Sequence, residues 1–233
     1  FVQRGGSIIN NIISKNTGGS GYAFYYDSDQ DGSITGNIIT DGLAYLDGMD
    51  VNGSLTNNIF SGGLAGNFEF SDDDAGISNN MILNSPEGTL EIKADSQVDQ
   101  TIYFSNNLFS YNASAYILKV GSDAYARNYV TTNQNNFINN DGLTVRAPSS
   151  ENYSVENNYW GTTTESDIQA IIYDWNDDAS LGFLDYDPYL STPNTLAPVS
   201  PPKNTVKQSA NGGVTLTWNA NPESDVAGYK VYY

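Results

Sequence analysis

The sequence of 233 residues contains neither cysteine nor histidine. Without cysteine there are no disulfides, no thiol redox chemistry and no thiolate metal sites. Without histidine the commonest general base and the imidazole metal ligand are both missing. Basic residues are scarce as well, since 9 Lys and Arg stand against 27 Asp and Glu, giving a formal net charge of −18. A field of this sign repels nucleic acid, and no apolar run reaches the roughly 18 residues of a membrane span, so we expect neither a nucleic-acid partner nor a membrane span.

A short motif recurs along the chain. It consists of an apolar residue, a small or polar one, Asn or Gly, Asn, and then two apolar residues. The clear copies are Ile8–Ile13, Ile34–Ile39, Leu55–Phe60, Ile77–Ile82 and Phe104–Phe109, and the weaker ones are Gln134–Ile138 and Val155–Trp160. Each of the first six copies is followed by a second strand-like segment, at Tyr22–Tyr26, Leu43–Leu46, Asn67–Phe70, Thr89–Ile92, Ala115–Val120 and Leu143–Val145. Alternating apolar residues between Gly, Asn and Asp turns predict short strands.

The second Asn of each copy returns about every 21–29 residues, an interval that suits a solenoid coil carrying insertions of variable length. Equivalent residues of neighbouring coils lie about 4.8 Å apart. A side-chain amide has donors and an acceptor, so stacked Asn residues can bond one another in a ladder. The predicted ladder consists of Asn11, Asn37, Asn58, Asn80, Asn107, Asn136 and Asn158. The alternative is that Asn-Asn is only turn chemistry, and seven copies in one register argue against it.

With these repeats, the sequence resembles the right-handed parallel β-helix proteins of the pectate-lyase-like superfamily over roughly residues 6–190. The resemblance implies an all-β solenoid of about seven coils. It does not imply one activity, because the scaffold hosts lyases, glycosidases, adhesins and stalks. The motifs of polygalacturonases and the Arg-rich pattern of pectate lyases are not present, and Asp72-Asp73-Asp74 falls in a predicted turn.

The end of the solenoid is predicted to carry a cap, since an open last coil would expose its core. Hydroxyl and acidic residues from Thr164 precede Ile168, Ile171, Ile172 and Trp175, whose spacing predicts one short amphipathic helix. The run from Tyr159-Trp160-Gly161 to Pro188-Tyr189-Leu190 is similar to the closing segment of exported bacterial β-helix domains. Trp160 and Trp175 are assigned to capping, with sugar stacking as the alternative.

Three parts are expected along the chain. Residues 1–190 form the β-helix domain, and residues 191–203, with four prolines, form a stiff extended linker. Residues 204–233 resemble the start of a fibronectin type III domain, with Trp218 as its core tryptophan and Tyr229 on the following strand. Such a sandwich, here truncated, needs about 100 residues. The resemblance implies a fragment of a longer modular protein, secreted or at the bacterial cell surface, attached to further domains of the same chain.

Acidic turns provide a candidate calcium site. Asp27-Ser28-Asp29-Gln30-Asp31-Gly32 matches the first half of a calcium loop, although Ile38 stands where a bidentate Glu would be required. Two later turns should stack on the same corner. The candidate ligands are Asp27, Asp29, Asp31, Asp47, Asp50, Asp72, Asp73 and Asp74. The alternative is a hydrated acidic edge without metal.

A basic row is the second candidate site. Lys93, Lys119 and Arg146 fall near the ends of the second strands of three consecutive coils, where they could bind a sugar carboxylate or sulfate. The alternative, which we prefer, is that they pair with acidic neighbours such as Glu69 and Glu91. Their offsets from the ladder Asn differ by up to three residues, enough to turn a side chain to the other face.

Two functions follow. The first is a non-catalytic extracellular module, a rigid spacer or adhesin associated with carbohydrate and stabilised by calcium, with a polysaccharide or cell-surface glycan as partner. The second is a polysaccharide lyase or glycoside hydrolase that acts on acidic polysaccharide with an active site partly outside this chain. The missing histidine and the scattered basic residues favour the first, and no catalytic residue is assigned.

Overall fold

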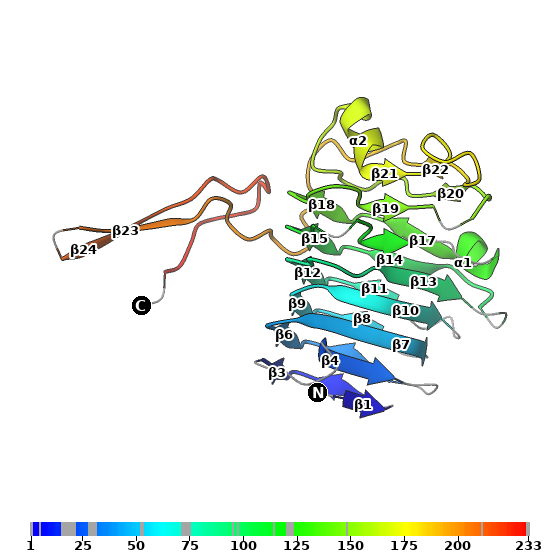
Figure 1. Cartoon of the computed structure of the whole chain (residues 1–233), viewed down its shortest axis with the longest axis horizontal. Coiled ribbons are helices and arrows are strands. Elements are labelled where there is room, and N and C mark those ends of the chain that lie inside the picture. The colour runs from blue at the N-terminus through cyan, green and yellow to red at the C-terminus, as the bar shows by residue number, and fades with distance from the viewer. Residues whose placement is uncertain are drawn as a thin grey trace.

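The computed structural model describes residues 2–4, 6–14, 22–27, 32–51, 54–70, 76–94, 96, 98–113, 115–119, 124–147, 149–210 and 212–231. Three parallel sheets lie around one axis and form a solenoid (Figure 1). Sheet A consists of β1 (Val2–Arg4), β4 (Tyr22–Asp27), β7 (Leu43–Val51), β10 (Leu64–Phe70), β13 (Leu90–Ala94), β16 (Leu118–Lys119), β19 (Val145–Arg146) and β21 (Ile172–Tyr173).

The other two sheets have six strands each. Sheet B consists of β2 (Ile8–Ile9), β5 (Ile34–Thr35), β8 (Ser54–Thr56), β11 (Gly76–Ser78), β14 (Ile102–Ser105) and β17 (Val130–Asn133). Sheet C consists of β3 (Ile12–Ile13), β6 (Ile38–Thr40), β9 (Ile59–Ser61), β12 (Met81–Leu83), β15 (Leu108–Ser110) and β18 (Asn136–Ile138). The predicted all-β parallel solenoid is confirmed. The expected number of about seven coils is slightly high for sheets B and C, in which six strands stack.

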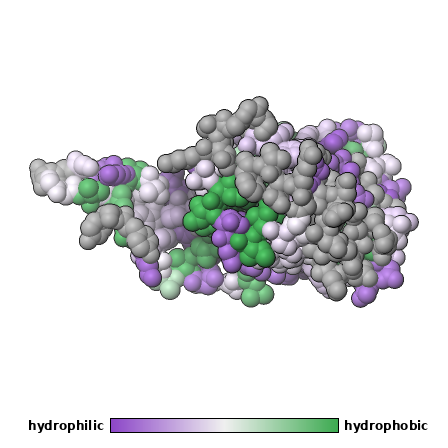
Figure 2. Space-filling model, turned by 90° about the horizontal axis from the view of Figure 1, so that it is seen from below, coloured by the Kyte–Doolittle hydropathy of each residue, from purple (hydrophilic) through white to green (hydrophobic). Residues whose placement is uncertain are grey.

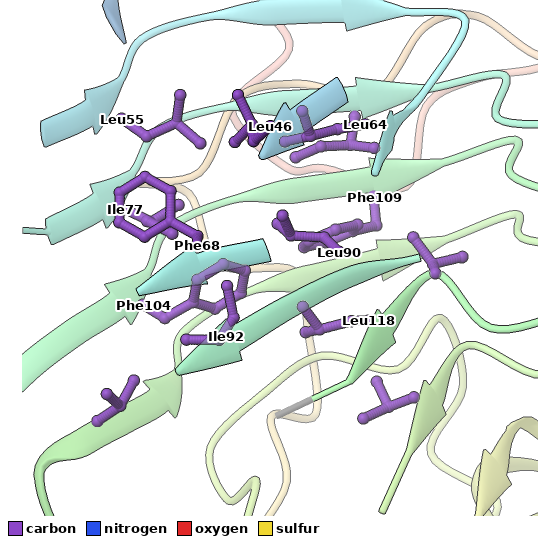
Figure 3. Close-up of a cluster of buried hydrophobic side chains, with 14 of the residues drawn as sticks. Leu46, Leu55, Leu64, Phe68, Ile77, Leu90, Ile92, Phe104, Phe109 and Leu118 are labelled. Carbon is purple, nitrogen blue, oxygen red and sulfur yellow. The ribbon is translucent and has the colours of Figure 1, made fainter. Parts of the chain in front are cut away.

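The core is a set of columns in which equivalent residues of successive coils stack. In sheet B, Ile34, Leu55, Ile77 and Phe104 are direct neighbours from strand to strand, and each is at most 1% exposed. Figure 3 shows Leu55, Ile77 and Phe104 with the residues of the other two sheets that face them. Each fully buried side chain of this size contributes roughly 1.5–3 kcal/mol. The repeat therefore determines the core by placing one apolar residue at the same place in each coil.

The Asn ladder runs along the turn between sheets B and C. The Oδ1 atom of Asn80 accepts hydrogen bonds from the backbone N–H and from Nδ2 of Asn58, both at 3.0 Å. The same pattern repeats for each pair in the series Asn11, Asn37, Asn58, Asn80, Asn107, Asn135 and Asn158. All members except Asn11 are fully buried. Burial is tolerated because each amide is hydrogen-bonded on both sides.

The ladder residue of the sixth coil is Asn135, so the assignment of Asn136 was wrong. The residue before each ladder Asn has a left-handed backbone, with φ between 56° and 70°. That position is filled by Asn or Gly in six coils, but by Gln134 in the sixth. The Asn-Asn pair is shifted there by one residue, and Asn136 instead begins β18 and exchanges two hydrogen bonds with the backbone of Asn194.

A second, shorter ladder follows sheet C and was not predicted. The backbone N–H of Ser85 donates to Oδ1 of Asn112, and the backbone N–H of Asn112 donates to Oδ1 of Asn140. The Nδ2 atoms of Asn112 and Asn140 also donate to carbonyl oxygens of the preceding coil, those of Ile82 and Phe109. Only the last coils have Asn at this position, so the sequence shows no long repeat there.

Two helices interrupt the strands among the described residues. Helix α1 (Ala124–Tyr129) was not predicted and leads into β17. Helix α2 (Glu165–Ile171) lies at the C-terminal end of the solenoid (Figure 1), where a capping helix was expected. The predicted helix is too long, because Ile172 pairs with Val145 in sheet A and ends the helix. Trp175 is consequently not helical, and 47% of it is exposed.

Trp160 closes a core column. It is 2% exposed and stacks on Phe137 with ring centroids 4.8 Å apart, and Phe137 in turn stacks on Phe109 at 5.0 Å. A buried ring cannot stack on a sugar, so the alternative role for Trp160 is wrong and the capping role fits. The end of the solenoid is completed by the two-stranded sheet of β20 (Tyr153–Ser154) and β22 (Leu184–Asp185).

The C-terminal segment passes along sheet C before leaving the solenoid. Besides the contacts of Asn194 with Asn136, the hydroxyl of Tyr111 donates to the carbonyl oxygen of Pro201 at 3.1 Å. The antiparallel pair β23 (Val206–Ala210) and β24 (Gly213–Thr217) then projects away on the side of β15 and β18 (Figure 1). The rings of Trp218 and Tyr229 meet edge to face at 4.9 Å. The boundaries at 190 and 203 remain predictions.

The opposite end of the solenoid carries an apolar surface. Figure 2 views the molecule from this end and shows a hydrophobic patch. Ile9 and Ile12, in the first strands of sheets B and C, are 51% and 75% exposed.

Candidate functional site

The outer face of sheet A carries a row of polar and aromatic side chains. Strand pairing places its members directly opposite one another on five neighbouring strands. The polar row consists of Asn67, Glu91, Lys119, Arg146 and Tyr173. All five are partly exposed, whereas their described strand neighbours, such as Leu90, Ile92, Leu118 and Val145, point into the core. Neighbouring strands lie about 4.8 Å apart, so the row forms a continuous polar strip along the solenoid axis.

A groove of about 400 Å³ opens at the Asn67 end of the polar row. Its lining residues are Tyr22, Leu43, Tyr45, Ala65, Gly66, Asn67, Glu87, Gly88, Thr89 and Glu91. Small residues create the hollow. A Cβ atom on Gly88 would lie 2.7 Å from that of Ala65, and one on Gly66, whose φ is +110°, would overlap the carbonyl oxygen of Leu46. A larger residue at Gly88 would fill part of the groove, and one at Gly66 would disturb the pairing of β10 with β7.

Tyrosines form the wall of the groove at its N-terminal side. The rings of Tyr22 and Tyr45 lie 4.8 Å apart, and Tyr25 stacks on Tyr45 at 5.8 Å with an interplanar angle of 6°. Flat aromatic walls beside Asn67 and Glu91 combine apolar contact with hydrogen bonding, the usual composition of a small-molecule site. The arrangement suits a ligand with both apolar faces and hydroxyl groups.

Lys119 is engaged in an ion pair within the polar row. Its Nζ lies 3.2 Å from Oε1 of Glu91, and both side chains are about one quarter exposed. This is the pairing that the alternative interpretation of the basic row expected. A partly exposed surface pair of this kind contributes about 0–1 kcal/mol, so it affects the charge of the face more than the stability of the fold.

Arg146 lies between two aromatic rings. Its guanidinium carbon is 5.4 Å from the ring centre of Tyr116 and 5.9 Å from that of Tyr173. Its Nε is buried without a hydrogen-bond partner, and no carboxylate of the described residues lies within ion-pair distance. Hydrogen bonds from Ser180 lower the pKa of Asp178, and the positive charge of Arg146 lowers that pKa further. Arg146 is thus a fixed cation that remains able to bind an anion.

Lys93 stands outside the polar row. It lies two residues beyond Glu91 on the same strand, so the two share a face, and it pairs in register with Glu69. Of the predicted basic row, the structure places Lys119 and Arg146 side by side, whereas Lys93 lies two residues further along its strand than Glu91, the neighbour of Lys119. All three side chains belong to the outer face of sheet A.

Most of the predicted calcium ligands lie outside the described residues. This applies to Asp29, Asp31, Asp72, Asp73 and Asp74, and to the side chains of Asp47 and Asp50. Asp27 ends β4, and its backbone pairs in register with that of Asp47. In the part of the chain that the structure describes, no group of three or more acidic side chains is close enough to hold a metal ion.

The sequence repeat did not predict the groove. The repeat predicts a strand at Tyr22–Tyr26 but does not indicate what its outward tyrosines bind. The signal was available, since Tyr22, Tyr25 and Tyr45 fall at partly exposed positions of adjacent predicted strands. Asn67 and Thr89 carried no signal of their own, because polar residues occur at most outward positions.

The class defined by these observations is the parallel β-solenoid with a polar and aromatic outer face. Residues 1–159 match the family described as the right-handed β-helix region, and the chain belongs to that family. No curated protein sequence and no solved structure is similar enough to count as a match. Among the described residues, no helix has the length and apolar character needed to cross a membrane.

Proposed function

We propose that this chain is a non-catalytic extracellular or cell-surface module, a rigid spacer or adhesin that binds a glycan on the outer face of sheet A. The observation that carries the proposal is the groove with its wall of Tyr22 and Tyr45 and its hydrogen-bonding groups at Asn67 and Glu91. Tyrosine rings can stack on the apolar faces of sugar rings, and the amide and carboxylate can bond their hydroxyl groups. The groove is open, as binding along a long chain requires.

The finer assignments belong to the same proposal. Membership of the pectate-lyase-like superfamily, a fibronectin type III domain from residue 204 and a bacterial, secreted origin rest on sequence resemblance. Calcium at the acidic turns rests on the spacing of Asp27, Asp29 and Asp31 and on the backbone pairing of Asp27 with Asp47. Hard carboxylate oxygens in this pattern suit that ion.

The proposal is tested by calorimetric titration of the chain with a panel of neutral and uronic-acid oligosaccharides. Replacing Tyr45 with Ala should weaken binding about tenfold, the value of about 1.4 kcal/mol that loss of an aromatic stacking surface costs. Tyr103→Ala is the matched control, because Tyr103 is 55% exposed on β14 of sheet B. The proposal is contradicted if the chain binds neither the neutral nor the uronic-acid oligosaccharides, or if the two variants lose the same amount of binding affinity.

The alternative function, a polysaccharide lyase, is favoured by one observation. Arg146 and Lys119 are adjacent, and a lyase needs cations to stabilise the acid group of its substrate and a base to remove a proton. Incubation with uronic-acid polysaccharides, with and without calcium, distinguishes the two functions. An unsaturated, ultraviolet-absorbing product that disappears in Arg146→Gln would replace the non-catalytic proposal with the lyase.

A further inference from the structure

A second cavity lies between the solenoid and the C-terminal segment, away from sheet A. It has a volume of about 240 Å³. The solenoid contributes Ile138, Asn139, Tyr159 and Gly161, and the C-terminal segment contributes Ser200, Pro201, Lys203, Asn219, Ala220, Asn221 and Pro222. Ligand sites occur preferentially at such junctions, and this volume is below the roughly 300–1,000 Å³ of pockets for drug-sized molecules. The cavity is suited to one small molecule rather than to a chain.

The walls of this junction pocket are held in place by buried hydrogen bonds. The carboxylate of Glu223, which is 5% exposed, accepts from the backbone N–H of Ser200 at 2.6 Å and from its hydroxyl at 3.0 Å. Asn221 donates to the carbonyl oxygen of the same Ser200. On the solenoid side, Tyr111 bonds the carbonyl of Pro201. A pocket with fixed walls loses little conformational entropy when a ligand binds.

Several polar groups of the junction pocket have hydrogen-bonding capacity left. Lys203 donates one bond to Oδ1 of Asn139 at 3.2 Å, which leaves two ammonium protons and the Nδ2 group of Asn139. Within the described part of the chain, the side-chain amide of Asn219 and the hydroxyl of Tyr159 make no hydrogen bond. These groups come from both sides of the junction, so a ligand between them can bond to both.

The remaining wall is apolar and rigid. Pro201, Pro222, Ile138 and Ala220 offer hydrocarbon surface. Gly161, with φ of +79°, packs closely against the backbone of Phe137, since a Cβ atom there would lie 2.8 Å from the carbonyl oxygen of Phe137. Apolar surface with a few directed donors and acceptors is the composition expected for a hydroxylated ring.

The charge of the junction pocket favours a neutral ligand. No carboxylate is among its described lining residues, and Lys203 is its one cation. The Glu223 carboxylate lies close behind the wall: burial raises the pKa of the Tyr159 hydroxyl, and the negative charge of Glu223 raises it further. This negative potential opposes the attraction of Lys203 for an anion. An uncharged polar molecule is repelled neither by the negative charge of Glu223 nor by the positive charge of Lys203.

We propose that the junction pocket binds a single neutral sugar unit. The sugar hydroxyls bond the free groups of Lys203, Asn139, Asn219 and Tyr159, and one face of the ring lies against Pro201 and Pro222. The site is separate from the groove on sheet A and does not depend on glycan binding there. Because the sugar contacts both partners, its binding also holds the C-terminal segment against the solenoid.

The test is a titration of the isotope-labelled 233-residue chain, followed by NMR. The probes are methyl glycosides of glucose, galactose, mannose and N-acetylglucosamine. We expect one of them to give saturable shifts at the side-chain amides of Asn139 and Asn219. Ala220→Trp should fill the pocket and abolish these shifts, and Ala227→Trp is its control, since Ala227 is exposed and does not line the pocket.

Further variants separate this site from sheet A. Lys203→Ala should weaken sugar binding about tenfold, equivalent to about 1.4 kcal/mol, whereas Lys207→Ala on β23 should not change it. Tyr45→Ala should leave the shifts at Asn139 and Asn219 intact. The proposal is overturned if no glycoside shifts these amides, if Ala220→Trp retains the response, or if only residues of sheet A respond.

Discussion

At each turn between sheets B and C, two neighbouring residues have different structural roles. The first takes the left-handed backbone conformation, which Asn and Gly adopt at low cost, and the second supplies the amide of the ladder. This explains why the repeat reads Asn-Asn or Gly-Asn. It also explains the misplaced residue of the sixth coil, where Gln134 takes the first role and Asn135 the second.

The ladder makes a prediction at the scale of single residues. Asn80→Ala removes the partner of the Asn58 backbone N–H and of the buried carbonyl of Leu55. Each buried group left unpaired costs about 1–3 kcal/mol, so we expect a loss of roughly 3–5 kcal/mol in the free energy of unfolding. Urea denaturation followed by circular dichroism measures it.

The control is Asn11→Ala, at the exposed end of the same ladder. It loses an exposed bond to Ile9 and a partly buried bond to Asn37, and it should cost only about 0.5–1.5 kcal/mol. Equal losses for the two variants would show that the amides act only as turn residues.

Among the strands, β10 has the greatest influence on the candidate site. The register between β7 and β10 shifts at Gly66, and the small residues Ala65 and Gly66 leave the hollow of the groove. The same strand carries Asn67 and so starts the polar row. This irregular strand therefore places the groove, with its wall of Tyr22 and Tyr45, next to the polar row.

Gly66→Ala should disrupt this arrangement. A side chain at φ of +110° is strained and would overlap the backbone of Leu46, so we expect a loss of about 3 kcal/mol or more in stability, together with loss of glycan binding. The control is Gly76→Ala in β11, where φ is not positive and the nearest atom to a new Cβ is 3.6 Å away. A thermal melt that places the two variants within about 0.5 kcal/mol of each other would contradict the role assigned to Gly66.

The whole molecule combines a fixed scaffold with a strong negative field. The chain carries a net charge of −18, and the core columns and the Asn ladder of its solenoid repeat from coil to coil. The acidic turns are predicted to stack on one corner, where their carboxylates would repel each other and a divalent cation would relieve that repulsion.

Calcium is expected to raise the melting temperature of the intact chain by about 5–10 °C at a calcium concentration of about 100 times the dissociation constant. Replacing Asp27, Asp29 and Asp31 with Asn should abolish the shift. The matched control replaces the exposed Asp141, Asp167 and Asp225 with Asn, which changes the net charge equally. Differential scanning calorimetry with and without chelator measures the shift. A chain that melts at one temperature in both buffers has no stabilising calcium site.

The sequence by itself determined the solenoid. The alternation of apolar and polar residues over short segments, the apolar residue at the same place in each coil and the Asn at each turn are local patterns. Because each pattern recurs in every coil, the prediction of the fold rests on several copies of it. A single misread coil, such as that of Asn136, therefore did not disturb the prediction of the fold. The helix at Glu165–Ile171 was also visible from its spacing, although its last turn was lost when Ile172 joined sheet A.

Only the tertiary structure decided which outward residues meet. The insertions between coils differ in length, so sequence offsets from the ladder could not show that Glu91, Lys119 and Arg146 are neighbours while Lys93 is one step away. The docking of Asn194 on Asn136 likewise joins residues 58 apart through bonds that no local pattern announces. Strand pairing follows the backbone hydrogen bonds of adjacent coils, and these depend on how each insertion folds.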